Sequence, residues 1–278
     1  VAAVPTQAWA RQVFPDLPVG QAVERLWQVI LQTVRADQPD PVAAWQQHDV
    51  ALKRITQFMA ANQVTAIHYF DPAPGPDGKP SSDLTIGLTE RPLWVGASAN
   101  TPAGVSFLPN MPTEEVFCTP HRERTSGYVR TSKPAFPFDR KVDQAWFRFE
   151  QGAVVEFQAA TGHDVLTEFL QIPHANRLGE VSLVDVRSPV NQSGLLFYET
   201  LFDENAVCHL AFGKAYPECM AGSAELTPEQ LVAAGVNDSD THVDFMIGTP
   251  TMQVAGIRAD GSRLAIMENG QVVSSILS

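Results

Sequence analysis

The sequence predicts an α+β fold in which N-terminal helices precede a largely antiparallel, mixed sheet with hairpins. Apolar residues recur at helical spacing within residues 1–62, and from Val64 onward the period changes to two, as in strands. Helices and strands also come in blocks rather than in strand–helix–strand alternation, which favours antiparallel pairing. We therefore expect one domain over residues 1–278, with a helical segment at 1–62 and a sheet-rich part at 63–278.

Two long helices are expected in the N-terminal segment. Apolar side chains recur at helical spacing through Gln21–Arg35. The polar stretch Asp37–Pro41 interrupts this pattern, and a second helix is expected over about Pro41–Asn62. Asp40 is suited to the N-cap of that helix, because its carboxylate can accept a free backbone N–H, and the proline that follows fits the first helical turn.

Strands are expected where apolar and polar residues alternate after Val64. The first candidates are Thr65–Phe70, Leu84–Leu88 and Leu93–Ala97. Between the first two, Asp71–Ser82 is rich in proline and glycine and is expected to be a surface loop. The clearest hairpin joins Ala145–Glu150 to Ala153–Ala159 through a Gln-Gly turn.

The remaining elements are short helices and a C-terminal series of hairpins. Helices are expected at Asp164–Gln171 and at Leu226–Gly235, the second one ending at a glycine. The tail Thr251–Val273 alternates around two turn sequences, Ala259–Gly261 and Glu268–Gly270. These elements complete the expected antiparallel sheet.

The composition argues against several classes of partner. The net charge is −12 and no basic patch is present, so nucleic acid is not an expected partner. No apolar run approaches the roughly 18 residues of a membrane span, and no secretory leader opens the chain, so we expect a cytoplasmic protein without membrane contact. The chain has three cysteines, Cys118, Cys208 and Cys219, and no two of them are closely spaced. This pattern indicates a reducing compartment and packing roles.

Chemically active side chains concentrate in Asp203–Asp244, which otherwise has the pattern of buried structure. They are acids, imidazoles and phenols: Asp203, Glu204, His209, Tyr216, His242 and Asp244. Burying such groups is costly unless they are paired, and a divalent metal would pair with this mixture of ligands. The alternation in His242–Ile247 is that of a strand, which would place His242 and Asp244 on one face as half of a metal site.

Other polar residues are ambiguous when each is considered alone. His209 and Tyr216 would share a helix face if Asn205–Tyr216 were helical, but a single histidine is more often a satisfied core residue. Glu180 begins an apolar strand and fits a strand-edge surface position about equally well. The adjacent Glu114 and Glu115 precede apolar residues, yet paired glutamates usually lie on a solvated face.

Four segments in order resemble the signature stretches of the thermophilic metallo-aminopeptidases, the group of aminopeptidases T and S. These segments are Asn110–Phe117, Arg177–Val181, Leu201–His209 and His242–Gly248. The similarity extends over essentially the whole chain, whereas the usual signatures of zincin proteases and serine hydrolases are absent. Family members carry an additional N-terminal α/β domain, so we expect this chain to correspond to the catalytic portion alone.

The resemblance implies a site that holds two divalent metal ions. Its implied ligands are a mixture of carboxylates and imidazoles: Glu115, Glu180, His209, His242 and Asp244. The resemblance places the first of these ligands at Glu114 or Glu115 and favours Glu115, although a one-residue length difference before Glu180 leaves the choice open. A pleated strand would direct only one of the two inward. Zn, Co and Mn all suit such nitrogen and oxygen ligands. The resemblance also implies a homodimer.

The implied reaction is the release of N-terminal amino acids from peptides with a free N-terminus. Metal ions would activate water, and Glu204, matching an acidic residue of the family site, would take its proton and deliver it to the leaving amine. Tyr216, matching the family's active-site tyrosine, would donate a hydrogen bond to the oxyanion. Two alternatives remain open: another metal-dependent hydrolase, such as a dipeptidase or amidase, or a non-catalytic fragment for metal binding or dimerisation.

Overall fold

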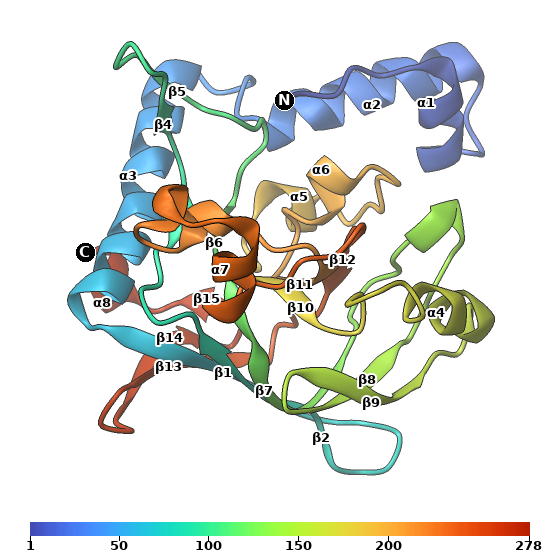
Figure 1. The fold of residues 1–278 in the computed structure, drawn as a ribbon. Helices are drawn as coiled ribbons and strands as arrows, with labels where there is room; N and C mark the ends of the chain where they lie inside the picture. The colour runs from blue at the N-terminus through green and yellow to red at the C-terminus, as the bar shows by residue number, and fades with distance from the viewer.

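The computed structural model describes residues 1–278 and contains two antiparallel sheets with helices around them (Figure 1). One sheet has eight strands and the other has five, and a two-stranded ribbon completes the strand pairing. Side chains from both sheets and from the third helix form one large apolar core. The architecture confirms the predicted α+β class and its largely antiparallel pairing.

Three helices form the N-terminal segment, α1 (Gln7–Val13), α2 (Val19–Thr33) and α3 (Pro41–Ala61). The two longer ones confirm the predicted helices. The Oδ1 of Asp40 accepts a hydrogen bond from the backbone N–H of Ala43 at 3.0 Å, which confirms its predicted capping role. No helix combines the length and apolar character that crossing a membrane requires.

The eight-stranded sheet has the order β15-β14-β13-β1-β2-β7-β8-β9. Its strands are β1 (Val64–Pro74), β2 (Pro80–Leu88), β7 (Pro120–Arg130), β8 (Trp146–Glu150), β9 (Ala153–Gln158), β13 (Gln253–Arg258), β14 (Arg263–Glu268) and β15 (Gln271–Val272). The predicted loop at Asp71–Ser82 was too long, because these two end residues pair across β1 and β2. Proline is compatible with extended backbone where no ladder N–H is needed. The prolines in this segment therefore do not end β1 and β2 as early as predicted.

The five-stranded sheet has the order β12-β11-β10-β6-β3. Its strands are β3 (Val95–Gly96), β6 (Glu115–Cys118), β10 (Leu178–Val184), β11 (His209–Gly213) and β12 (His242–Met246). The helix considered for Asn205–Tyr216 is wrong, since β11 pairs with β10 and β12. Pairing on both sides outweighs the helix propensity of the alanines there. The strand predicted at Leu93–Ala97 is reduced to two residues.

Shorter elements complete the fold. They are α4 (His163–Phe169), α5 (Pro189–Gln192), α6 (Thr200–Asp203), α7 (Pro228–Ala233), α8 (Ser274–Leu277), the ribbon strands β4 (Ala99–Asn100) and β5 (Ser106–Phe107), and the 3-10 turns η1 (Pro137–Asp139), η2 (Pro217–Cys219) and η3 (Ser223–Glu225). Helices α4 and α7 confirm the two predicted short helices. Thr227 caps α7 through a reciprocal capping box with Gln230. All three cysteines are buried and free, in agreement with the predicted packing roles.

An aromatic cluster fixes one face of the five-stranded sheet against the core. Phe212 of β11 lies 4.8 Å from the ring centre of Phe147 and 5.1 Å from that of Phe245. Phe149 and Phe169 also pack against the Phe212 ring. Because successive residues of a strand point to opposite faces, this packing orients the neighbours of Phe212 toward the other face.

The substitution Phe212→Ala is expected to lower the free energy of unfolding by about 3–5 kcal/mol, because it leaves a cavity among four aromatic rings. Phe107→Ala is the matched control, since Phe107 is 44% exposed in a short ribbon and its removal should change stability by no more than about 0.5 kcal/mol. Urea titration followed by tryptophan fluorescence measures both values. Equal losses in the two variants would contradict the assigned packing.

Candidate metal centre

Four neighbouring strands of the five-stranded sheet direct polar side chains to the face opposite the aromatic cluster. Glu180 of β10 pairs with Ala211 of β11, and Ala211 pairs in turn with Asp244 of β12. Directly opposed residues share a face, so the small Ala211 side chain lies between the two carboxylates. His209 lies two residues before Ala211 and His242 two residues before Asp244, so both imidazoles are on this face.

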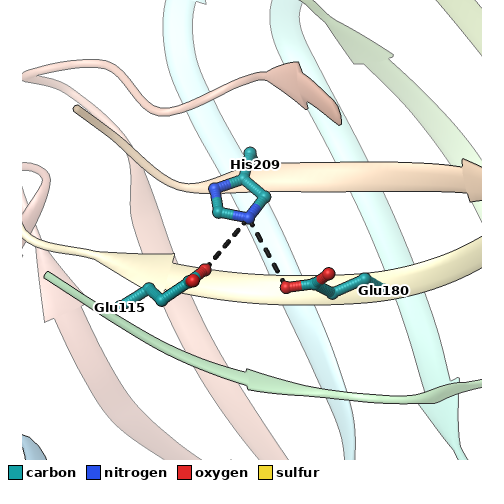
Figure 2. Close-up of side chains that lie close together, drawn as sticks. All are labelled: Glu115, Glu180 and His209. Atoms are coloured by element: carbon teal, nitrogen blue, oxygen red, sulfur yellow. Dashed lines mark ion pairs between the residues drawn. The ribbon is translucent and has the colours of Figure 1, made fainter. Parts of the chain in front are cut away.

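The first group of potential ligands surrounds His209 (Figure 2). Its Nε2 lies 3.1 Å from Oε2 of Glu115 and 3.5 Å from Oε1 of Glu180. Figure 2 shows the ring directed between the two carboxylates. All three side chains are buried. The start of β6, the middle of β10 and the start of β11 therefore contribute one ligand each.

The second group consists of Glu180, His242 and Asp244. The Nε2 of His242 lies 3.4 Å from Oε2 of Glu180 and 3.6 Å from Oδ1 of Asp244. Glu180 belongs to both groups, and its two oxygens face different imidazoles. A carboxylate in this position can bridge two ions.

Backbone carbonyls orient both imidazoles. The Nδ1 of His209 is 2.8 Å from the carbonyl oxygen of Glu204, and the Nδ1 of His242 is 2.7 Å from that of Lys214. With a proton on Nδ1, each imidazole donates a hydrogen bond to its carbonyl. The lone pair on Nε2 is then available to a metal ion held between the imidazole and the carboxylates. Metal-binding histidines characteristically have this second hydrogen bond.

The two adjacent glutamates at the start of β6 point to different environments. Glu114 forms a two-pronged ion pair with Arg35, with N–O distances of 2.5 and 2.9 Å. Glu115 instead faces His209. This geometry supports Glu115 as the ligand, because the carboxylate of Glu114 already has its own cation.

Glu204 and Tyr216 lie beside the ligand groups. Glu204 follows α6 directly, and burial together with the neighbouring carboxylates of Glu115 and Asp244 raises its pKa to about 10. The ring of Tyr216 lies 5.0 Å from that of His242, and its side chain is 37% exposed. Burial and the nearby carboxylates raise the pKa of the Tyr216 phenol, so it keeps its proton and can donate a hydrogen bond.

Two clefts meet at these residues. One has a volume of about 480 Å³ and contains Glu115, Glu180 and Tyr216 on its walls. The other has a volume of about 570 Å³ and is bordered by the aromatic side chains of Phe136, Phe138 and Tyr198. The residues Thr200, Glu204, His242 and Asp244 line both clefts. A substrate could therefore extend to either side of the ligand groups.

The chemistry of this cluster fits bound cations. Oε2 of Glu115 is buried, makes no hydrogen bond of good geometry and faces Nε2 of His209 at 3.1 Å. Burial would lower the pKa of His242, but the contacts with Asp244 and Glu180 outweigh it and raise that pKa to about 10. Burial raises the pKa of Glu115, because it disfavours the charged carboxylate. Protons held at these positions supply the positive charge that metal ions would replace.

The donor set suits particular metals. Carboxylate oxygens and imidazole nitrogens without thiolate are suitable for Zn, Co or Mn. Cys208 precedes His209 but points elsewhere, since its Sγ contacts the Val184 carbonyl oxygen at 3.4 Å and the Met267 sulfur at 3.6 Å. It packs in the core, as the sequence indicated.

Two residues near the site were not identified from the sequence. Arg35 holds Glu114 from the end of α2, and Asn205 accepts a hydrogen bond from the backbone N–H of Glu114 at 2.6 Å. Both act across large separations in the chain and belong to no short motif. Asn205 could have been noticed only because it directly follows Glu204.

Comparisons with known proteins agree over the whole chain. The profile of the thermophilic metalloprotease family M29 matches residues 1–272. Aminopeptidase 2 of Geobacillus stearothermophilus is 44% identical over 268 residues, which cover 96% of this chain and 63% of that protein. Aminopeptidase T of Thermus aquaticus is 44% identical over 266 residues, covering 95% and 63%. The chain thus spans just under two thirds of the length of these relatives.

Solved structures extend this agreement to the fold. The structure of wild-type AmpT from Thermus thermophilus superposes with a TM-score of 0.87 at 41% identity, covering 97% of this chain and 63% of that one. A 2,5-dihydroxypyridine dioxygenase from Pseudomonas putida gives a TM-score of 0.52 at 12% identity, which indicates a shared fold only.

Divalent metal should stabilise this chain through the shared carboxylate. Zn²⁺ at about 100 times its dissociation constant is expected to add about 2.7 kcal/mol to the free energy of unfolding, since it binds the folded state. Glu180→Gln should remove most of this gain, because Glu180 belongs to both ligand groups. Glu268→Gln, at an exposed position of β14, is the control and should keep it. Thermal melting with and without Zn²⁺ measures the effect, and an unchanged gain in Glu180→Gln would contradict the site.

Proposed function

The chain belongs to the thermophilic metalloprotease family M29, and from this premise we propose that it is the catalytic portion of a di-metal aminopeptidase. Its proposed reaction removes N-terminal amino acids from peptides that have a free N-terminus. The observation that carries the proposal is the position of Glu180, whose two oxygens face His209 and His242 from a shared buried location. This position divides five potential ligands into two groups suited to two ions.

We propose that the two ions are divalent and that each group binds one of them. The ligands would be Glu115, Glu180 and His209 for one ion and Glu180, His242 and Asp244 for the other. Paired metal ions supply a nucleophilic water at neutral pH and polarise the scissile carbonyl. Zn, Co and Mn are the proposed candidates on the basis of the ligand types.

Glu204 is the proposed acid–base residue. Its carboxyl group lies where the two clefts meet, and burial keeps its pKa high. Bound metal ions would lower this pKa, so that the ionised carboxylate could accept the proton of the attacking water and hold it until the amine leaves. Its backbone carbonyl also accepts from His209, so the same residue orients a ligand.

Tyr216 is the proposed hydrogen-bond donor to the oxyanion. Its side chain lines the 480 Å³ cleft beside Glu180 and His242. The phenol is half-buried and keeps its proton, so it can donate to an oxygen that gains negative charge in the transition state. Phe117 packs against the ring at 5.6 Å and limits its orientation.

The relatives support the choice of substrate. They are named aminopeptidases, and the acidic side chains along the clefts would favour a substrate carrying a cationic α-amino group. Homodimer formation and a cytoplasmic location belong to the same proposal and stay predictions. A dipeptidase or amidase would use the same ions on a different substrate, and a purely structural metal site would show no turnover.

Metal-dependent hydrolysis of a leucine anilide is expected from metal-stripped protein after Zn, Co or Mn is added back singly. N-acetylation of the substrate should abolish turnover, because an exopeptidase must recognise the free amine. Anilide release is followed by absorbance. Equal turnover of the free and acetylated substrates would favour an amidase, and a metal-loaded chain without turnover on either would contradict the proposed enzyme.

Two conservative substitutions test the assigned roles. Glu204→Gln should lower kcat by about 10²- to 10⁴-fold through the loss of proton transfer. Tyr216→Phe should lower it by roughly 10²- to 10³-fold through the loss of one oxyanion donor. Both variants should keep bound metal, as measured by plasma emission. Tyr128→Phe, on the eight-stranded sheet away from the site, is the matched control and should be fully active. Full activity in either site variant would remove that residue from the mechanism.

A further inference from the structure

Asn205 connects the parts of the site that come from different elements. Its side chain is fully buried, although asparagine is mostly found at the surface. Its Oδ1 accepts from the backbone N–H of Glu114 at 2.6 Å, and its Nδ2 donates to the carbonyl oxygen of Leu201 at 2.9 Å. The same Nδ2 lies 3.5 Å from Oε1 of Glu204. One amide group therefore contacts the start of β6, the helix α6 and the proposed acid–base residue.

The other side of Glu114 is held by the helical segment. Arg35 lies just beyond α2 and binds both oxygens of Glu114, in the two-pronged geometry that best fixes a carboxylate. The guanidinium of Arg35 stacks on the ring of Trp45 at 5.0 Å, and its Nη2 is 3.2 Å from Nδ1 of His48. Arg35 is thus immobilised from several directions.

Glu114 is therefore fixed through its backbone and its side chain at once. The next residue is Glu115, whose carboxylate must meet His209 across β10, the one strand between β6 and β11. A shift of Glu114 would move Glu115 directly, since they are adjacent in the chain. The strand begins at Glu115, which pairs with Val184 of β10, so the contacts of Glu114 act at the residue directly before the first strand pair.

We propose that Asn205 and the Arg35–Glu114 ion pair form a positioning clamp that sets Glu115 relative to Glu204 and His209. The name Glu114 clamp is used below for these three residues: Arg35, Glu114 and Asn205. The clamp assigns the N-terminal helices a part in the site, since Arg35 reaches it from the end of α2. It rests on the proposed function only for its effect on turnover, whereas its effect on metal affinity is independent of the substrate.

Metal affinity and kinetics together test the clamp. Asn205→Asp keeps an oxygen for the Glu114 N–H and replaces the donating nitrogen, while Arg35→Lys keeps the charge and loses the two-pronged contact. Each substitution is expected to weaken Zn²⁺ binding or lower kcat by about 10- to 100-fold, the usual effect of losing a group that orients metal ligands. KM for a leucine anilide should change little, because neither residue borders the clefts.

Matched variants separate positioning from general loss of stability. Asn191→Asp changes an asparagine that bonds the Val186 carbonyl away from the site. Arg187→Lys breaks a two-pronged pair with Asp185 that lies outside both clefts. Calorimetric titration with Zn²⁺ and melting curves are measured for all four variants. If Asn205→Asp does not fold, Arg35→Lys decides alone.

Two results would overturn the clamp. One is a folded clamp variant with the Zn²⁺ affinity and kcat of the wild type. The other is an equal loss of affinity in the control variants, which would indicate general destabilisation. If the wild type itself hydrolyses no anilide, the proposed function fails, but the Zn²⁺ affinities still decide whether Asn205 and Arg35 position Glu115.

Discussion

The arrangement of the site depends on the contact of one buried carboxylate with two imidazoles. Glu180 lies in the middle of β10, where Ala211 on the neighbouring strand leaves room for it and for Asp244 beyond. Burial opposes a charge on Glu180, but the contacts with His209 and His242 lower its pKa below the usual range. An ionised carboxylate between two imidazoles requires strands at fixed spacing, because a sheet places opposed residues at defined distances on one face. The five-stranded sheet supplies that spacing.

The two faces of this sheet have complementary roles. One face packs Phe212 and Phe245 into the aromatic core, and the other presents the polar groups toward the two clefts. Strand alternation links them, so a change of register by one residue would reverse both faces. The helices add a further constraint, since Arg35 at the end of α2 holds the residue before Glu115. A rigid core on one side thus supports ligand placement on the other.

Local patterns in the sequence predicted some of this well. The alternation of His242–Ile247 identified the face of β12, and the capping signal at Asp40 placed the start of α3. The helix considered around His209 was wrong because strand pairing with β10 and β12, which is a long-range effect, decides the conformation there. The choice between Glu114 and Glu115 needed Arg35, which lies 79 residues away from Glu114. Contacts of that separation leave no periodic signal in a single sequence.

The central claim is that two ions share Glu180 between the two ligand groups. An X-ray structure of the zinc-loaded protein, with anomalous data collected on both sides of the zinc edge, tests it most directly. The account predicts two anomalous peaks per chain, one beside Glu115 and His209 and one beside His242 and Asp244, with a Glu180 oxygen bound to each. A single peak enclosed by four protein ligands would contradict it, because that arrangement is typical of a structural site.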